Sequence, residues 1–517
     1  MRAFQGPFGT AKADFLNRVR KFSFAAFAAF LIFTVFWFMP RPSDSAFSAL
    51  VIDPDRFLQG SDPSWMPMSA AMCGGMLLCL LGFVYIKNTV GHDVDLGIFH
   101  LVQISPLKRS LYLLGKLLSN VFLLLLFLCF MAAASFVTMM IRFPGRLIPI
   151  YAFFSPFLCV IPGLFFVAAF ALLTDCAPGF RKSSGLSIAV FLGLFTMILF
   201  MGTMNVNPYR LTSIFDFSGY MWIRDSISDA ARAVTGQPVT HINVLTNFHG
   251  SGTSLKALSF SGLTFSASYL TDKLILVAFS IFLTFLSSLM LPKSQKTAAA
   301  RSKQSPRETE SAPARIPAFR FGLSHSEAAI LLKGQPAFWW IAAAGLWIAN
   351  CFSPLNTVRS TLFPIAFAWM LPVFSTMGCL EHQTGVITIL RTIPKAPFRL
   401  AFCCWNTGLA VSLLTGFPVL LRLLSSGDFV GFLSALIFVV FVPSAALFLG
   451  EWTKTNRAFE IFHLVLCYLM INIPTLVFVG DYFTTASALR TGGLVLITGA
   501  MLFLTFAKRL APRYPTA

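Results

Sequence analysis

Acid, glycine and proline residues recur at the same spacing in two distant segments of the chain. The two sets are Asp93, Gly97 and Pro106, and Glu381, Gly385 and Pro394. Each residue of the second set lies 288 positions after its counterpart. An acid is favourable at the positive start of a helix, and a proline cannot continue one. The pattern predicts a short helix in each segment, and the shared offset favours an internal duplication.

Two interpretations of these six residues stay open. An acid after an apolar run, then a glycine and a proline, are ordinary signals for helix ends and turns. In the functional interpretation each short helix lies parallel to the membrane and transmits force from another protein that contacts it. Neither interpretation gives the residues a catalytic role.

The elements that must position these segments are membrane-spanning helices. Of the 517 residues, 56% are hydrophobic and 11% are charged, and the mean hydropathy is +0.75. Charged residues approach a quarter of an ordinary soluble domain, and a bilayer-crossing helix needs roughly 20 apolar residues. We therefore expect an all-α polytopic membrane protein with about twelve transmembrane helices, arranged as two six-helix repeats. The expected spans are 22–39, 67–86, 117–141, 149–173, 185–206, 274–291, 337–352, 362–380, 400–421, 430–450, 461–479 and 491–507.

The polar segments between the spans define the domain organisation. Lysine and arginine are retained on the cytoplasmic side during insertion, which places both termini and the basic linker there. The net charge of +19 reflects these cytoplasmic segments rather than nucleic-acid binding. The predicted parts are an amphipathic N-terminal segment 1–21, a first transmembrane half 22–291 with an outer segment 207–273, a linker 292–336, a second half 337–507 and a tail 508–517.

The first acid–glycine–proline segment continues into a longer pattern. After Asp93 and Gly97 the chain has Ile-Ser-Pro, then an arginine, a tyrosine and the pair Gly115-Lys116. This segment resembles the permease of a type 2 ATP-binding-cassette transporter, in which it builds the coupling helix. The second copy keeps Glu381, Gly385, Pro394 and Arg399 but has Cys403-Cys404 in place of Gly115-Lys116.

The resemblance implies an exporter permease in a bacterial cytoplasmic membrane. In that family the two coupling loops seat in two copies of a cytoplasmic ATPase, whose ATP binding drives alternating access. The residues that carry this role by resemblance are the six of the two acid–glycine–proline sets. The family also places an amphipathic helix before the first span of each half, and the candidates here are 13–21 and 321–332. The transported substrate is not readable, although the phenylalanine-rich spans are compatible with a hydrophobic one.

Other chemistry lacks its motifs in the sequence. No Gly-x-x-x-x-Gly-Lys-Ser/Thr phosphate loop occurs, so ATP hydrolysis is expected in a partner and not in this chain. No Cys-x-x-Cys or His-Glu-x-x-His pattern predicts a metal site, and no cofactor is expected. The long polar segments contain none of the ten cysteines, which excludes a disulfide framework.

Two other functions stay open at this stage. A secondary transporter of the major-facilitator type also has six plus six spans, but it usually relies on ionisable residues within the spans, and the middles of the predicted spans are uncharged. A membrane-bound transferase would need its chemistry in the outer segment. That segment offers Asp216, Arg224, Asp225, Asp229, His241, His249 and Ser251, without a spacing that defines a catalytic set. The simpler expectation is an outer cap with a helix near 220–234 and a strand near 239–245.

Overall fold

The structure is a computed structural model of the chain, and it forms two compact units. The described residues are 2–39, 47–95, 98–104, 107–177, 180, 187–188, 190–195, 210–239, 242–247, 255–291, 323–332, 335–385, 387, 393, 395–472 and 485–510. The first unit comprises Met1–Arg181 and Val190–Leu291, and the second comprises Lys182–Ala189 and Pro292–Ala517.

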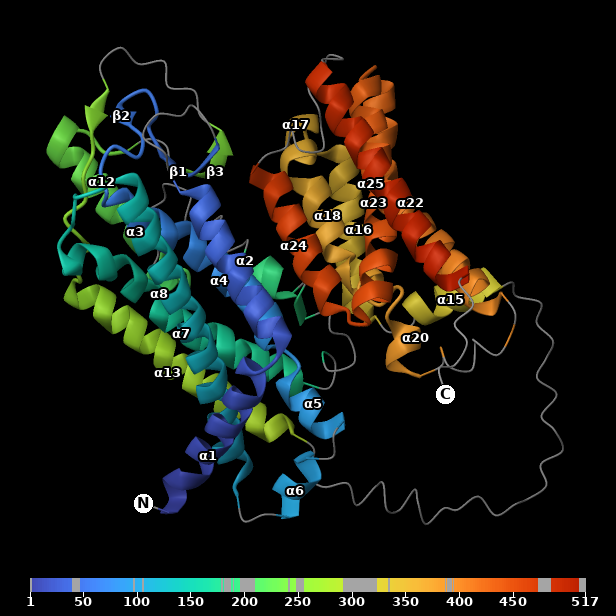
Figure 1. The fold of residues 1–517 in the computed structure, drawn as a ribbon, viewed down its shortest axis with the longest axis horizontal. Helices are drawn as coiled ribbons and strands as arrows, with labels where there is room; N and C mark the ends of the chain where they lie inside the picture. Colours follow the sequence, from blue (N-terminus) through green and yellow to red (C-terminus); the bar gives the residue numbers. More distant parts are fainter. Residues whose placement is uncertain are drawn as a thin grey trace. The chain divides into compact units, whose positions relative to one another are not determined.

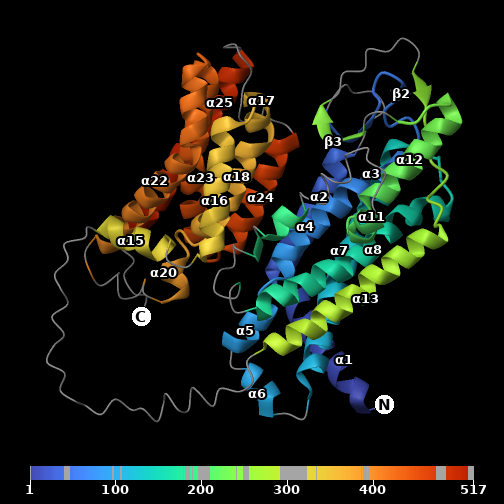
Figure 2. The same ribbon diagram turned by 180° about the vertical axis from the view of Figure 1, so that it is seen from behind.

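The first unit is a helical bundle with a small cap at one end (Figure 1). Its main helices are α1 (Arg2–Val19), α2 (Phe22–Phe38), α3 (Trp65–Ser69), the π-helical η1 (Ala70–Gly74), α4 (Gly75–Ile86), α5 (Thr89–Asp95), α6 (Ile98–Ile104), α7 (Arg109–Arg142), α8 (Ile150–Cys176), α11 (Arg210–Phe215), α12 (Tyr220–Thr235) and α13 (Ala267–Met290). Helix α8 packs against both α7 and α13, which lies along it in Figure 2. The cap and the short helices α5 and α6 lie at opposite ends of this unit.

The centre of the first unit is the helix that begins at α3 and runs through η1 and α4. It extends over residues 65–86, and all of these residues except Leu77 are buried. Side chains such as Leu78 and Phe83 are fully enclosed, because α7 and α8 pack directly against this helix. Continuous apolar sequence without an amphipathic stripe is typical of a helix that is surrounded on all sides.

The cap is built from the outer segment and the residues between α2 and α3. Strand β1 (Phe47–Ile52) pairs antiparallel with β3 (Ile242–Asn247), and β2 (Phe57–Leu58) pairs parallel with β4 (Lys256–Ala257). The indole N–H of Trp65 donates to the carbonyl oxygen of Leu258 at 2.8 Å and so ties the cap to the central helix. Helix α12 closely matches the helix expected near 220–234, and β3 overlaps the expected strand.

The second unit is also a bundle of helices. Its helices are α15 (Leu323–Leu332), α16 (Ala337–Phe352), α17 (Leu355–Thr357), the π-helical η2 (Val358–Leu362), α18 (Phe363–Trp369), α19 (Leu371–Phe374), α20 (Leu380–Gln383), α22 (Ala396–Ser425), α23 (Phe429–Thr453), α24 (Arg457–Asn472) and α25 (Thr485–Leu510). Helix α23 packs against both α22 and α25, as α8 does against α7 and α13. The two π-helical segments also begin 288 residues apart.

The described helices have the lengths and composition of membrane spans. Seven of them are long and apolar enough to cross a bilayer, or eight if a bent pair formed by α1 and α2 is one span, and α16 is a shorter apolar helix. This is the architecture of an all-α polytopic membrane protein. The expected span 337–352 coincides with α16, whereas most of the expected span 185–206 lies outside the described residues.

The expected span 362–380 differs in detail from a regular helix. It consists of the last residue of η2, then α18 and α19, followed by turns before α20. Pro364 and Pro372 lie in the first turns of α18 and α19. Proline lacks a backbone N–H, which is tolerated at the start of a helix but removes a hydrogen bond within a continuous one. The apolar pattern located this segment, and its helix is interrupted at Met370, shortly before Pro372.

Candidate functional site

The first loop segment is fixed by a carboxylate from the base of a long helix. Asp175, near the end of α8, accepts hydrogen bonds from the backbone N–H groups of Asn88 at 2.8 Å and Thr89 at 2.7 Å. These groups lie at the start of α5, where backbone N–H groups have no partner within the helix. Asp175 therefore acts as a helix cap supplied from another helix, and it fixes α5 to α8.

Asp93, the first predicted site residue, lies on α5 in a buried ion cluster. Its carboxylate accepts a hydrogen bond from the Tyr112 hydroxyl at 2.5 Å and lies 2.8 Å from the Lys116 ammonium, both on α7. The same ammonium lies 2.8 Å from Asp14 of α1, which also pairs with Arg18. Lys116 thus joins the loop helix α5 to the N-terminal helix α1 across the base of α7.

Gly115 allows α1 to approach α7 closely enough for this bridge. A Cβ atom at Gly115 would lie 2.7 Å from the carbonyl oxygen of Pro7, which is too close for any side chain. The Gly115-Lys116 pair therefore has two separate functions at one helix contact. Glycine permits the backbone approach, and lysine supplies the charge that joins the three elements.

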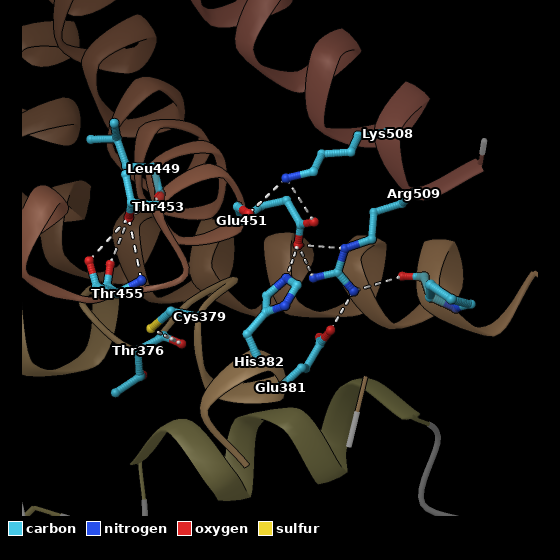
Figure 3. Close-up of polar contacts among 11 residues, drawn as sticks. Thr376, Cys379, Glu381, His382, Leu449, Glu451, Thr453, Thr455, Lys508 and Arg509 are labelled. Carbon is cyan, nitrogen blue, oxygen red and sulfur yellow. Dashed lines mark hydrogen bonds and ion pairs between the residues drawn. The ribbon is translucent and has the colours of Figure 1, made fainter. Parts of the chain in front are cut away.

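Glu381, the second predicted acid, lies in a larger ion cluster at the base of the second unit (Figure 3). Arg509 of α25 lies between two carboxylates and pairs with both Glu381 of α20 and Glu451 of α23. Glu451 also contacts His382, whose Nε2 lies 3.0 Å from Oε2, and Lys508, whose ammonium donates to the Glu451 backbone carbonyl at 2.9 Å. One loop helix and two long helices therefore meet in this cluster.

The entry to this loop is also shaped by close backbone contact. Gly378 adopts φ +72°, and a Cβ atom there would lie 2.6 Å from the carbonyl oxygen of Leu447 on α23. A Cβ atom at Gly450 would lie 2.0 Å from the carbonyl oxygen of Met377. Two glycines thus allow the turn before α20 to lie directly against α23, beside the Glu451 cluster.

The two clusters share an acid at equivalent positions but take their cations from different helices. Lys116 of α7 neutralises Asp93, whereas Cys404 is the residue 288 positions after Lys116 and is a buried thiol. Arg509 of α25 supplies the missing charge in the second unit. The replacement of Gly115-Lys116 by Cys403-Cys404 in the second segment is therefore accompanied by a different source of charge.

The remaining predicted site residues are unevenly placed. Gly385 follows α20 with φ +73°, a conformation that favours glycine at a helix end. Gly97, Pro106 and Pro394 lie outside the described residues. The sequence did not reveal the partners Asp14 and Arg509. The one available signal was the basic pair Lys508-Arg509 in the last turn of α25, directly after the predicted span 491–507.

The neighbourhood of Glu381 includes a second acid, Glu327 of α15. Burial raises the pKa of Glu327 above its ordinary value of 4.5, and the negative charge of Glu381 raises it further. The folded unit therefore binds this proton more tightly than the unfolded chain does. The ionised carboxylate is a destabilising element that appears as pH rises above 4.5.

Replacing Glu327 by glutamine should stabilise the protein at neutral and alkaline pH and have little effect in acid. The neutral amide keeps the shape of the side chain and removes the charge that faces Glu381. Thermal unfolding of the detergent-solubilised E327Q variant, measured at about pH 8 and about pH 4, checks this sign. A gain in Tm of the same size at both pH values would contradict it.

No protein-family model matches the chain, and no curated protein or solved structure gives a significant match.

Proposed function

We propose that the chain is the permease of a type 2 ATP-binding-cassette exporter, with two six-helix halves fused in one polypeptide. The observation that carries the proposal is the pair of acids, Asp93 and Glu381, at one sequence offset. Each lies on a short helix that a buried cation joins to the base of the long helices. Because the ion pair fixes the short helix to the long helices, a movement of the short helix that a partner causes can be transmitted to the bundle.

The internal repetition supports two equivalent halves. The segments η1 and η2 have the same length and the same 288-residue offset as the two acids. The packing of α8 with α7 and α13 has its counterpart in α23 with α22 and α25. A duplicated permease would present two loops, and each loop would bind one copy of a cytoplasmic ATPase.

The distribution of charge supports an external energy source. In the long described helices the charged side chains lie within the first or last eight residues, as Lys116, Asp175 and Glu451 do. Coupling to a proton or sodium gradient usually places such groups within the spans. Asp216, a candidate for transferase chemistry, instead accepts hydrogen bonds from the backbone N–H groups of Tyr220 and Met221 at the start of α12.

Purification from native membranes in mild detergent tests the proposal. The chain alone should hydrolyse no ATP, because it lacks a phosphate loop, and it should carry a separate ATPase subunit with it. The basic termini and linker should lie on the same side of the membrane as that subunit. Substrate movement by the isolated chain in liposomes, driven by a proton gradient, would contradict the proposal and favour a secondary transporter.

A further inference from the structure

A cavity of about 440 Å³ in the second unit has no part in the proposed coupling mechanism. It lies between α16, α18 and α22, with Leu332 of α15 at one end. Four of the nine tryptophans of the chain line it, namely Trp339, Trp340, Trp347 and Trp369. Its size falls within the range of small-molecule sites, and aromatic lining is typical of them.

The walls of this cavity offer hydrocarbon and almost no hydrogen bonds. Trp339 and Trp369 donate their indole N–H groups to each other's backbone carbonyls, at 3.2 and 3.1 Å. Trp347 donates to the carbonyl of Leu414 at 3.0 Å, and the Thr415 hydroxyl donates to Val411 at 2.9 Å. An occupant with amide or hydroxyl groups would lose its hydrogen bonds here. The cavity therefore favours an alkyl chain.

The rim of the cavity continues into the apolar outer surface of the unit. Leu414 is 66% exposed and Ile348 is 53% exposed, and both lie on apolar helices of a membrane protein. The acyl chains of the bilayer are the hydrocarbon that such a surface meets. A lipid chain can therefore enter from the side without crossing a polar layer.

A cation lies next to one end of the cavity. The Arg422 guanidinium donates to the carbonyl oxygen of Asn350 at 2.8 Å, and Asn350 follows the wall residue Ile348 by two positions. Arg422 is therefore within about one helical turn of the cavity wall. Its other N–H groups have no partner among the described residues, and a guanidinium is suited to binding a phosphate.

We propose that the cavity and Arg422 together form a phospholipid site. One acyl chain occupies the tryptophan-lined cavity, and the phosphate of the same lipid binds Arg422 at the cavity end. The site is separate from the Glu381 cluster, and its existence does not depend on the identity of the energy source.

Filling the cavity tests the acyl-chain half of this site. Ala344 lines the cavity and is exposed, so A344F places a ring in the cavity without enlarging a buried core residue. Gly345 is the matched control, because it does not line the cavity and a Cβ atom there meets nothing within 4 Å. The probe is phosphatidylglycerol with dibrominated acyl chains, exchanged for endogenous lipid before delipidation in detergent.

Native mass spectrometry counts the retained probe, and bromine quenching reports its contact with tryptophan. The native chain and G345F should retain one lipid with quenched fluorescence, and A344F should lower retention by about tenfold. Equal retention and quenching in A344F would overturn the proposal. Recovery of the native chain as a lipid-free dimer would also overturn it, since a second copy would then cover the cavity.

A second pair of measurements tests the phosphate half. Dibrominated diacylglycerol has the same chains without a phosphate and should be retained less well than phosphatidylglycerol by the native chain. R422Q should remove this preference while diacylglycerol retention stays unchanged. An undiminished preference for phosphatidylglycerol in R422Q would show that Arg422 does not bind the phosphate, which would overturn the proposed site.

Discussion

Replacing Arg509 by methionine should strongly destabilise the second unit. The guanidinium pairs with Glu381 and with Glu451, and its own side chain is 2% exposed. Methionine keeps much of the side-chain volume and leaves the buried carboxylate of Glu451 and the partly exposed carboxylate of Glu381 without their main cation. Removing one partner of a buried ion pair costs about 3–5 kcal/mol. For a unit of this size we expect a decrease in Tm of about 10 °C, measured by thermal unfolding in detergent.

Two further variants separate lost charge from lost packing. K508M changes the adjacent cation, which contacts Glu451 from the rim of the cluster, and should have a smaller effect. The triple variant R509M/E381Q/E451Q removes all three charges and should recover much of the lost stability, because neutral replacement of a whole buried cluster is often tolerated. A triple variant as unstable as R509M would show that packing, and not unpaired charge, explains the loss.

Charge reversal at Asp93 should weaken the ATPase complex more than charge reversal at Glu381. In D93K the new ammonium faces Lys116. Among the described residues, Lys116 then keeps one carboxylate partner, Asp14. In E381K the new ammonium faces Arg509, but the negative charge of Glu327 acts on this position, and Glu451 still neutralises Arg509. We expect D93K to cost about 3–5 kcal/mol and to displace α5, and E381K to cost less.

Co-purification of the ATPase, with membrane expression measured in parallel, checks this order. The matched control is H92K, which adds a positive charge to the same short helix at an exposed position. H92K should retain the partner if the buried cluster is what positions α5. Normal ATPase recruitment by a D93K/E381K double variant that reaches the membrane would contradict the coupling role. The acid–glycine–proline residues would then serve only to form helix ends and turns.

The helices of this protein were more predictable than the contacts between them. Apolar runs located α16 and α23 closely, because a bilayer span requires a continuous length of hydrocarbon side chains. The interruption of the span 362–380 at Met370 was readable in principle from Pro372. The segment 292–322 and most of the span 185–206 lie outside the described residues. The linker and this span therefore stay predictions.

The positions of the two candidate acids could be found from the sequence, but their ion-pair partners could not. The repeat identified Asp93 and Glu381, because helix-end residues recur along the chain at a fixed offset. Their cations come from far along the sequence, and Arg509 is on a different helix from the one that the repeat would suggest. Long-range ion pairs depend on tertiary packing, which a single sequence does not encode in its local spacing.

The central claim is that the α5–α6 segment contacts a cytoplasmic ATPase, and site-specific photocrosslinking tests it most directly. Ile104, at the end of α6, is 82% exposed and precedes α7, whereas Leu147 is 71% exposed and follows the opposite end of α7, about 50 Å away. A crosslinking amino acid at Ile104 should capture the ATPase subunit in native membranes, and one at Leu147 should not. Failure at Ile104 with a stable complex present, or equal capture from Leu147, would contradict the account.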